Sequence, residues 1–463
     1  MSEEMKTLRK QLLRDSRSGY DVLEEAQLRR MEDYCADYKA FLGNKTERLS
    51  ARAAIAAAKA HGFVEYRRGM ALEAGDKVYT CNRGKGLMLA VMGRESMAEG
   101  VQIAAAHIDS PRLDLKPNPL YEDSELAYFK THYYGGIRKY QWVTIPLQLQ
   151  GVVVKKDGTA VEVCIGEKGE PQLVITDLLP HLGGEQGKKP LSEAIPAETL
   201  NILLGSRPIG DEDDSDRVKL HVMKRLYDKY GITEADFASA ELEAVPAADA
   251  VDIGIDGSMI GSYGHDDRVC GYAALRALLE LDAPAKTAVC VLADKEEIGS
   301  MGVTGMQSAV FETFLSDLCD SQNVPLKVCF ENSFCLSADV TAAYDPNFAD
   351  VFDKKNAAFL NHGVGLCKYT GARGKSGSSD AGAETVAYVR SLLDGAGVRW
   401  QICELGKVDA GGGGTVAQYM ANRNIATLDA GVPVLSMHAP FEVVAKLDCY
   451  EMYRACKAIY EAR

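Results

Sequence analysis

The sequence has no C-x-x-C pair, no low-complexity tract, and no apolar run long enough for a signal core or a membrane span. Its twelve cysteines are scattered, and several lie inside apolar segments where a reduced thiol acts as a small hydrophobic residue. We therefore expect a globular protein with free thiols and a cytoplasmic location.

Basic residues are also in the minority among the charged residues. The 52 Lys and Arg residues are outnumbered by 66 Asp and Glu residues, which gives a formal net charge of −14. This balance argues against nucleic acid or an anionic membrane as a partner. With 463 residues, 46% of them hydrophobic, the chain is long enough to form two cores.

Two kinds of segment alternate along the chain. Helical periodicity and buried strands fill residues 1–112 and return over 252–463, whereas 113–251 carries short alternating strands separated by proline and glycine. The simplest architecture is an α/β domain interrupted by a β-rich insertion. Within the insertion, the acidic run at 211–216 is expected to be a solvated loop.

The apolar pattern predicts both helices and strands. Helical segments are expected at 8–15 and in a long stretch through 51–63, and a further helix is expected after GHDDR, over 268–281. Strands of the α/β part are expected at 77–81, 86–92, 101–106, 287–293, 326–338, 398–405 and 432–438, and strands of the insertion at 142–154, 160–166 and 171–179.

The segment ADKEEIGS, residues 293–300, places two adjacent glutamates where an apolar run ends. A solvated loop would explain this pair simply, since glutamate is common on surfaces. The preceding run TAVCVLA, however, is typical of a buried parallel strand, and open α/β sheets bind ligands at the carboxyl ends of such strands. If other strands deliver metal-type ligands to the same edge, the two glutamates could hold a metal and a proton respectively.

Histidine and carboxylate side chains follow several of the other predicted strands. Each residue alone is more often structural than a ligand, but their number at corresponding strand ends favours a shared site. The set comprises His107 and Asp109 after VQIAAA, Glu296 and Glu297, Asp339 after the strand at 326–338, His438 after PVLSM, and Asp266 in the loop GHDDR before the predicted helix.

This chemistry suits a pair of divalent cations that act as Lewis acids. One aspartate can bridge both ions through its two oxygens at the roughly 3.5–4 Å separation of two-metal sites. In the H-x-D pair, the carboxylate of Asp109 can fix the ring of His107. The adjacent glutamates are expected to leave the strand end in different directions, so that one is a ligand and the other a general base.

The chain resembles the M18 aspartyl aminopeptidases, a family of two-metal zinc exopeptidases, over nearly its whole length. The motifs that carry the resemblance are AAHIDSPRLDLKPNP, GHDDR, DKEEIGS, SADV and SMHAPFE, in the order of the family. It implies a mixed-sheet catalytic domain with helices on both faces and a β-rich dimerisation domain at 113–251. It also implies a peptide substrate and a homo-oligomer built from dimers, up to a dodecamer.

The resemblance assigns a role to each residue of the set. His107, Asp266 and Asp339 hold one metal; Asp266, Glu297 and His438 hold the other; Glu296 is the general base and Asp109 supports His107. The ions are expected to be zinc, although manganese or cobalt suits the same ligands.

Three further positions bear on specificity. Lys375 in GARGKSGSSD matches a family lysine that could pair with an acidic side chain or a terminal group of the substrate, while an ordinary lysine on a flexible surface loop is the alternative. His181 in the insertion matches a histidine that enters the neighbouring subunit's active site, although such a residue between strands is usually structural. Ala342 stands where many family members have histidine, which leaves the preference for amino-terminal Asp or Glu less certain than hydrolysis.

Other functions remain open at this point. A phosphate-binding loop is disfavoured because Tyr369 occupies the position that requires glycine before GKS, and DAGGGGT lacks dinucleotide spacing. A two-metal deacylase or carboxypeptidase, or an aminopeptidase of broad or neutral specificity, would use the same ligands. A non-catalytic scaffold with a structural metal would not need the spare carboxylate of Glu296.

Overall fold

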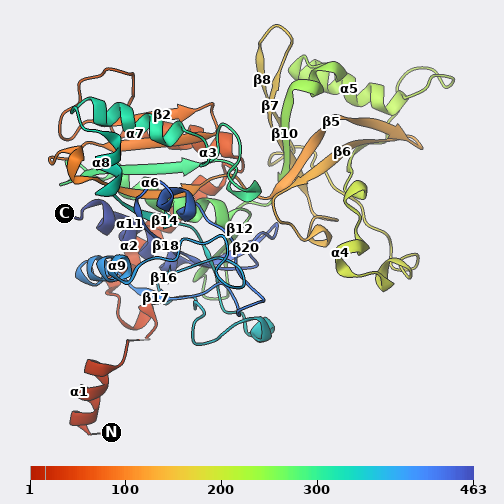
Figure 1. Cartoon of the computed structure of the whole chain (residues 1–463). Helices are drawn as coiled ribbons and strands as arrows, with labels where there is room; N and C mark the ends of the chain where they lie inside the picture. Colours follow the sequence, from red (N-terminus) through yellow and green to blue (C-terminus); the bar gives the residue numbers. More distant parts are fainter. Residues whose placement is uncertain (1, 16) are drawn as a thin grey trace.

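The computed structural model describes residues 2–15 and 17–463, which form two lobes (Figure 1). One lobe surrounds a nine-stranded sheet and the other a six-stranded sheet, which residues 112–246 contribute. The predicted α/β class is confirmed, with helices packed on a mixed sheet.

The nine-stranded sheet has the order β1-β2-β3-β13-β4-β14-β18-β16-β17. Strand β13 pairs antiparallel with β3 and parallel with β4, and β14 is parallel to β4 on its other side. Three central strands therefore end at one edge. The bounds are β1 Val64–Glu65, β2 Lys77–Asn82, β3 Gly86–Val91, β13 Thr287–Ala293, β4 Val101–His107, β14 Phe334–Ala338, β18 Ala426–Gly431, β16 Val364–Cys367 and β17 Trp400–Ile402.

Side chains alternate between the two faces of this sheet, and each face is covered by helices. In β13, Cys290 and Leu292 join one core while Val289 and Val291 join the other. The first core is covered by α2 Glu25–Leu42, α3 Glu47–Ala60, α6 His265–Leu279, α9 Ala383–Gly395 and α11 Lys446–Tyr460. The second is covered by α7 Val310–Asp320, α8 Leu326–Glu331 and α10 Ala417–Ala421.

The six-stranded sheet has its own apolar core, which includes Trp142, Leu149 and Phe129. Its order is β8-β7-β10-β5-β6-β9. The bounds are β8 Ala160–Ile165, β7 Leu147–Val154, β10 Ala240–Pro246, β5 Arg112–Asp123, β6 Leu126–Tyr134 and β9 Ile202–Gly205, with α4 Leu191–Ala194 and α5 Arg217–Tyr230. The acidic run at 211–216 is exposed, as expected.

A small five-stranded sheet completes the larger lobe. It has the order β11-β12-β20-β19-β15. The bounds are β11 Val251–Ile253, β12 Met259–Ser262, β20 Glu442–Ala445, β19 Pro433–Leu435 and β15 Thr341–Ala342. Strand β12 leads into α6, and β19 leads toward His438.

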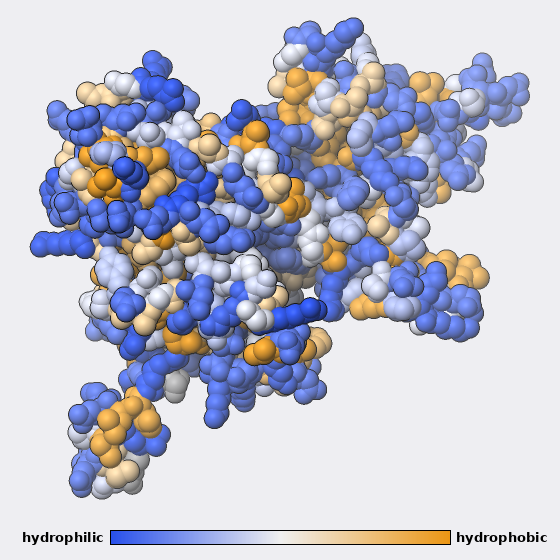
Figure 2. All heavy atoms as spheres, viewed as in Figure 1, coloured by the Kyte–Doolittle hydropathy of each residue, from blue (hydrophilic) through white to orange (hydrophobic). Residues whose placement is uncertain are grey.

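Helix α1, Glu3–Leu12, projects from the larger lobe and has no buried residue (Figure 1). Met5, Leu8 and Leu12 are exposed, and Figure 2 shows apolar atoms gathered on this helix. Within residues 2–15 and 17–463, no helix has both the length and the apolar composition that crossing a bilayer requires.

Two strand predictions are wrong. Residues 326–338 form helix α8 followed by the shorter strand β14, because Pro325 starts a helix and a short apolar run is compatible with either structure. Residues 171–179 form an irregular segment in which Leu173 and Val174 make only isolated bridges. By contrast, the predicted strand at 287–293 coincides with β13 and is fully buried.

Candidate metal centre

Three neighbouring parallel strands bring the first candidate residues together. His107 is the last residue of β4, opposite Ala293 at the end of β13, and Asp339 directly follows β14. His107 Nε2 lies 3.6 Å from Asp339 Oδ1. The other ring nitrogen, Nδ1, lies 3.1 Å from the backbone oxygen of Asp109 and 3.6 Å from its Oδ1. Nε2 is therefore the atom available to a metal.

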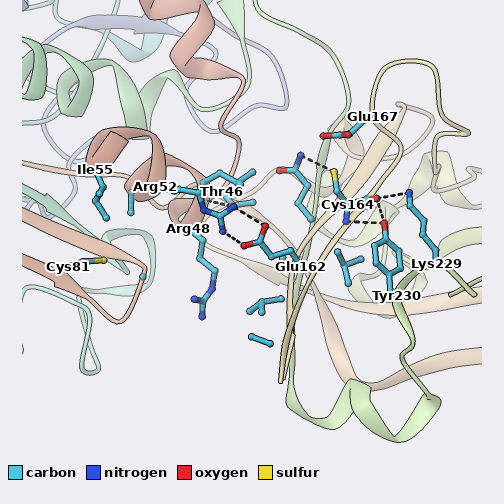
Figure 3. Close-up of a pocket in the computed structure, with 18 of the residues that line it drawn as sticks. Thr46, Arg48, Arg52, Ile55, Cys81, Glu162, Cys164, Glu167, Lys229 and Tyr230 are labelled. Carbon is cyan, nitrogen blue, oxygen red and sulfur yellow. Dashed lines mark hydrogen bonds and ion pairs between the residues drawn. The ribbon is translucent and has the colours of Figure 1, made fainter. Parts of the chain in front are cut away.

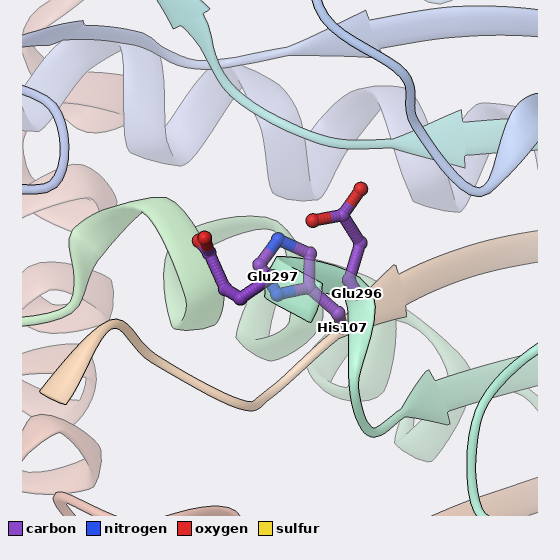
Figure 4. A group of neighbouring side chains, drawn as sticks. All are labelled: His107, Glu296 and Glu297. Atoms are coloured by element: carbon purple, nitrogen blue, oxygen red, sulfur yellow. The ribbon is translucent and has the colours of Figure 1, made fainter. Parts of the chain in front are cut away.

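The two glutamates lie in a turn beyond the strand and not at its last residues, since β13 ends at Ala293. Glu296 and Glu297 begin a short 3₁₀ turn, after Lys295 in the left-handed conformation at φ 69°. The backbone N–H of Glu296 donates to Asp109 Oδ1 (3.0 Å), and that of Glu297 donates to Asp109 Oδ2 (3.3 Å). Asp109 thus holds the turn as well as contacting His107. Figure 4 shows the two glutamate carboxylates on different sides of the His107 ring.

Asp266 and His438 are placed by a different part of the fold. Asp266 is the second residue of α6, so the prediction that it lies in a preceding loop is wrong. His438 follows β19 of the five-stranded sheet, so the prediction that it ends a strand of the main sheet is also wrong. The Asp266 error arises because α6 begins with polar residues, which the apolar pattern does not mark as helical. The His438 error arises because a short apolar segment does not show which sheet it joins. His438 has φ 64°, a left-handed conformation that is uncommon for residues other than glycine.

A buried carboxylate joins these two elements. Glu442 Oε2 accepts hydrogen bonds from the backbone N–H of His265 (2.6 Å) and Asp266 (3.1 Å). Glu442 Oε1 accepts one from the backbone N–H of His438 (2.6 Å). His438 Nδ1 lies 2.8 Å from the carbonyl oxygen of Gly136, which can only accept, so its Nε2 faces the other candidates.

The predicted ligands form two groups that share one residue. His107, Asp266 and Asp339 place ligand atoms within 4.8 Å of one another, and so do Asp266, Glu297 and His438. A third such group, outside the predicted ligand sets, consists of His107, Glu296 and Glu297. His438 Nε2 lies 2.7 Å from Asp266 Oδ2 and 3.4 Å from Glu297 Oε1. Each group combines one imidazole with carboxylates, a donor set that fits Zn²⁺, Mn²⁺ or Co²⁺. The residues present therefore fit a metal.

The charges in this cluster strongly perturb one another. Burial raises the pKa of Glu296 to about 8; His107 opposes this rise and Asp339 adds to it. Burial would lower the pKa of His438, yet Asp266 and Glu297 raise it to about 11. Without a cation His438 therefore carries a proton at neutral pH, which a cation must displace to bind this ring.

Lys375 and His181 are not joined to this cluster. Lys375 Nζ lies 3.1 Å from Asp380 Oδ2 and 3.8 Å from the ring centroid of Tyr369, on an exposed loop. His181 is exposed in the lobe of the six-stranded sheet. Neither residue belongs to a metal-type group among residues 2–15 and 17–463. Ala342 ends β15, opposite Val434 of β19.

Sequence reasoning missed Glu442 and Tyr134. Glu442 lies four residues after His438 in SMHAPFE, so its position was a signal that could have been used. Tyr134 ends β6, and its hydroxyl donates to Asp109 Oδ2 (2.8 Å). Nothing in the local sequence of Tyr134 indicates this contact, because the two residues come from different lobes.

A large cavity lies elsewhere, between α3 and strands β7 and β8 (Figure 3). It has a volume of about 830 Å³ and is lined by residues that include Arg52, Glu162, Cys164 and Tyr230. None of the predicted site residues lines it. The three metal-type groups among the described residues therefore lie outside this cavity.

Comparison with known proteins agrees with this chemistry. A family model described as aminopeptidase I zinc metalloprotease (M18) matches residues 43–460. A Clostridium acetobutylicum protein named Probable M18 family aminopeptidase 1 is 48% identical over 450 residues, covering 95% of this chain and 97% of the relative. The relative of the same name from Thermotoga maritima is 44% identical over 438 residues, 93% of this chain and 96% of the relative.

Solved structures show the same relationship. The M18 aminopeptidase of Thermotoga maritima superimposes with a TM-score of 0.93 at 42% identity, covering 97% of this chain and 99% of that one. Aminopeptidase I of Clostridium acetobutylicum gives a TM-score of 0.92 at 44% identity, covering 97% and 100%. The chain therefore belongs to the M18 family of zinc metallo-aminopeptidases, enzymes that hydrolyse peptides.

Proposed function

We propose that this metallo-aminopeptidase works with two divalent cations, most simply zinc. His107, Asp266 and Asp339 would hold one ion, and Asp266, Glu297 and His438 the other, with Asp266 as the bridge. The observation that carries the proposal is that these two groups of ligand atoms share Asp266. Manganese or cobalt would suit the same donors.

Bound cations would supply Lewis acidity, which polarises the scissile carbonyl and lowers the pKa of water. Glu296 is the proposed general base. Its carboxylate would take a proton from the water that attacks the carbonyl carbon and give it to the departing amine as the C–N bond breaks. Glu296 also has a ligand-type atom within 4.8 Å of His107 and Glu297, so its carboxylate lies within reach of the same centre as the proposed ligands.

Asp109 is the proposed positioning residue for both His107 and Glu296. It is fully buried, lies beside the His107 ring and accepts the backbone N–H of Glu296. A carboxylate with these partners restricts the ring orientation and the turn that carries the base. Loss of Asp109 should therefore disturb two functions at once.

The proposed substrates are peptides with an amino-terminal Asp or Glu. Lys375 is the proposed partner of the acidic side chain, by way of a charge-assisted hydrogen bond. In the structure Lys375 pairs with Asp380, so an acidic substrate would have to compete with that carboxylate. This pairing is the specific observation that favours the competing proposal, an aminopeptidase of broad or neutral specificity.

The lobe at 113–251 is the proposed dimerisation domain of a cytoplasmic homo-oligomer, up to a dodecamer. Support comes from an exposed apolar group around His181, comprising Leu178, Leu179 and Leu182, in a lobe that shows apolar patches in Figure 2. The yeast mApe1 structure, 21% identical, is described as a dodecamer. In an assembly of this chain, His181 would reach the active site of a neighbouring subunit.

A substrate panel tests the proposal. The chelated enzyme would be reconstituted with Zn²⁺, Mn²⁺ or Co²⁺ and assayed on amino-acid amides with Asp, Glu, Ala or Leu at the amino terminus. N-acylated peptides serve as the control for deacylase or carboxypeptidase activity. We expect two ions per chain, highest kcat/KM for Asp and Glu, and no turnover of N-acylated peptides. Equal rates on all four amides would replace acidic specificity with broad specificity.

A further inference from the structure

The end of strand β6 reaches from the smaller lobe into the metal centre. Tyr134 is the last residue of β6, and Gly135 and Gly136 follow it. Tyr134 is 8% exposed, and its hydroxyl donates to Asp109 Oδ2 at 2.8 Å. The six-stranded sheet is thus connected to the carboxylate that holds the turn of the glutamate pair.

The carboxylate of Asp109 joins the two lobes. Its Oδ1 accepts from the N–H of Glu296, and its Oδ2 accepts from both the N–H of Glu297 and the hydroxyl of Tyr134. Without the tyrosine hydroxyl, Oδ2 would keep only the longer bond of 3.3 Å to Glu297. A fully buried carboxylate needs such donors to stay in one orientation.

Tyr134 is itself fixed from the side of the smaller lobe. The guanidinium of Arg112 lies 3.9 Å from the centroid of the Tyr134 ring, within the range of a cation–π contact. Arg112 Nε lies 2.8 Å from Asp114 Oδ1 and 3.3 Å from Glu243 Oε2. The tyrosine ring therefore packs against an arginine that is itself paired with two carboxylates.

Gly135 and Gly136 contact the second proposed metal group, at Glu297 and His438. The carbonyl oxygen of Gly136 accepts from Nδ1 of His438 at 2.8 Å, which directs Nε2 toward Asp266. Gly135 has φ 72°, and a Cβ at this position would lie 3.0 Å from Glu297 Oε2. Only glycine fits this approach without moving the carboxylate.

We propose that residues 134–136 position both halves of the metal centre, Tyr134 by way of Asp109 and Gly136 by way of His438. This role goes beyond dimerisation for the smaller lobe, and it rests on the proposed two-metal site. Partners of metal ligands and of their supporting carboxylates typically change metal affinity or activity by about 10–100-fold. The geometry of hydrolysis is thus set from both lobes.

Tyr134→Phe is the sharpest test, because it removes the hydroxyl and keeps the ring under Arg112. We expect kcat to fall about 10-fold or more while KM stays within about twofold, and chelator to strip metal at about 10-fold lower concentration. Metal content is measured by mass spectrometry during the chelator titration, which gives a readout independent of turnover.

Tyr230→Phe is the matched control. Its hydroxyl also lies in the smaller lobe, but it donates to the backbone oxygen of Cys164, away from the metal centre. We expect kcat, KM and the chelator midpoint of this variant to match those of the unaltered enzyme. If Tyr134→Phe and Tyr230→Phe behave alike in all three measurements, the positioning role of Tyr134 is refuted.

Gly135→Ala provides a second, independent test of the same segment. The added methyl should displace the Glu297 carboxylate and lower metal content, with secondary structure and melting temperature as controls for folding. Unchanged metal affinity in a folded Gly135→Ala protein would count against the proposal. If the unaltered enzyme binds no metal at these ligands, the two-metal function itself fails, which is a different outcome.

Discussion

The residues at the strand edge and the residues on the two exposed loops differ in what fixes them. His107 and Asp266 are buried, Asp339 is half-buried, and their ligand atoms lie within 4.8 Å of one another. Lys375 and His181 are exposed, and Lys375 pairs with a neighbour on its own loop. The proposed metal ligands are brought together within one chain. The proposed roles of Lys375 and His181 would instead depend on a second molecule, which is the substrate for Lys375 and another subunit for His181.

The largest effect is expected within the strand-edge cluster. Glu296→Gln should lower kcat by ~10²–10⁴ because it removes a proton acceptor, while two ions stay bound. Glu297→Gln should instead lower metal content, because it weakens a proposed ligand. Turnover and metal analysis of both variants check this difference. Loss of an ion from Glu296→Gln with full occupancy in Glu297→Gln would reverse the two roles.

The next largest effect is expected at His181. If this residue acted within its own subunit, it would not differ from the strand-edge residues in the way proposed above. We propose that His181 donates a hydrogen bond to the substrate or to the oxyanion in the neighbouring subunit. Removal of such a donor typically costs about 10²–10³ in kcat, with a smaller change in KM, so His181→Ala should be nearly inactive. Co-assembly with Glu296→Gln should restore partial activity, because some subunits then combine an intact Glu296 with the partner's His181. The mixed species would be verified by mass spectrometry. Absence of recovery in verified mixtures would rule out action between subunits.

A smaller effect is expected at Lys375. Lys375→Ala should weaken acidic substrates by about 1.5–3 kcal/mol, the typical contribution of a charge-assisted hydrogen bond, and leave Ala and Leu amides nearly unchanged. The measurement is kcat/KM on paired acidic and neutral amides. Lys368→Ala is a suitable control, because Lys368 also pairs with Asp380 but is not the predicted substrate partner. Equal losses on both substrate classes would remove Lys375 from acidic recognition.

The smallest expected change, counted per pH unit, follows from the proton that His438 holds in the metal-free protein. Because the pKa of His438 is raised to about 11 in the metal-free protein, binding at neutral pH must displace its proton. Metal affinity should therefore fall as pH falls, by about tenfold per unit for each proton displaced. Metal titrations between pH 6 and 8, with proton release followed in weak buffer, check the sign. Affinity independent of pH would exclude His438 as a protonated ligand.

The sequence predicted the strand-edge residues because each follows an apolar run or a glycine turn, and buried strands of one sheet share an edge. It could not predict Tyr134 or Gly136, because their contacts join segments from different lobes. Asp266 and His438 were identified as site residues, but their elements were assigned wrongly. Residue chemistry is local to the sequence, whereas the choice of sheet depends on long-range pairing.

The order of strands in the main sheet has a consequence for synthesis. Strand β4, which carries His107, lies between β13 and β14, and both are made after the whole six-stranded sheet. The smaller lobe has its own core, so it can fold on the ribosome while β4 still lacks both neighbours. The nascent chain would thus have no hydrolytic centre until β13, β14 and His438 had emerged. Because these elements come late in the sequence, the chain would gain peptidase activity only after most of it had been synthesised.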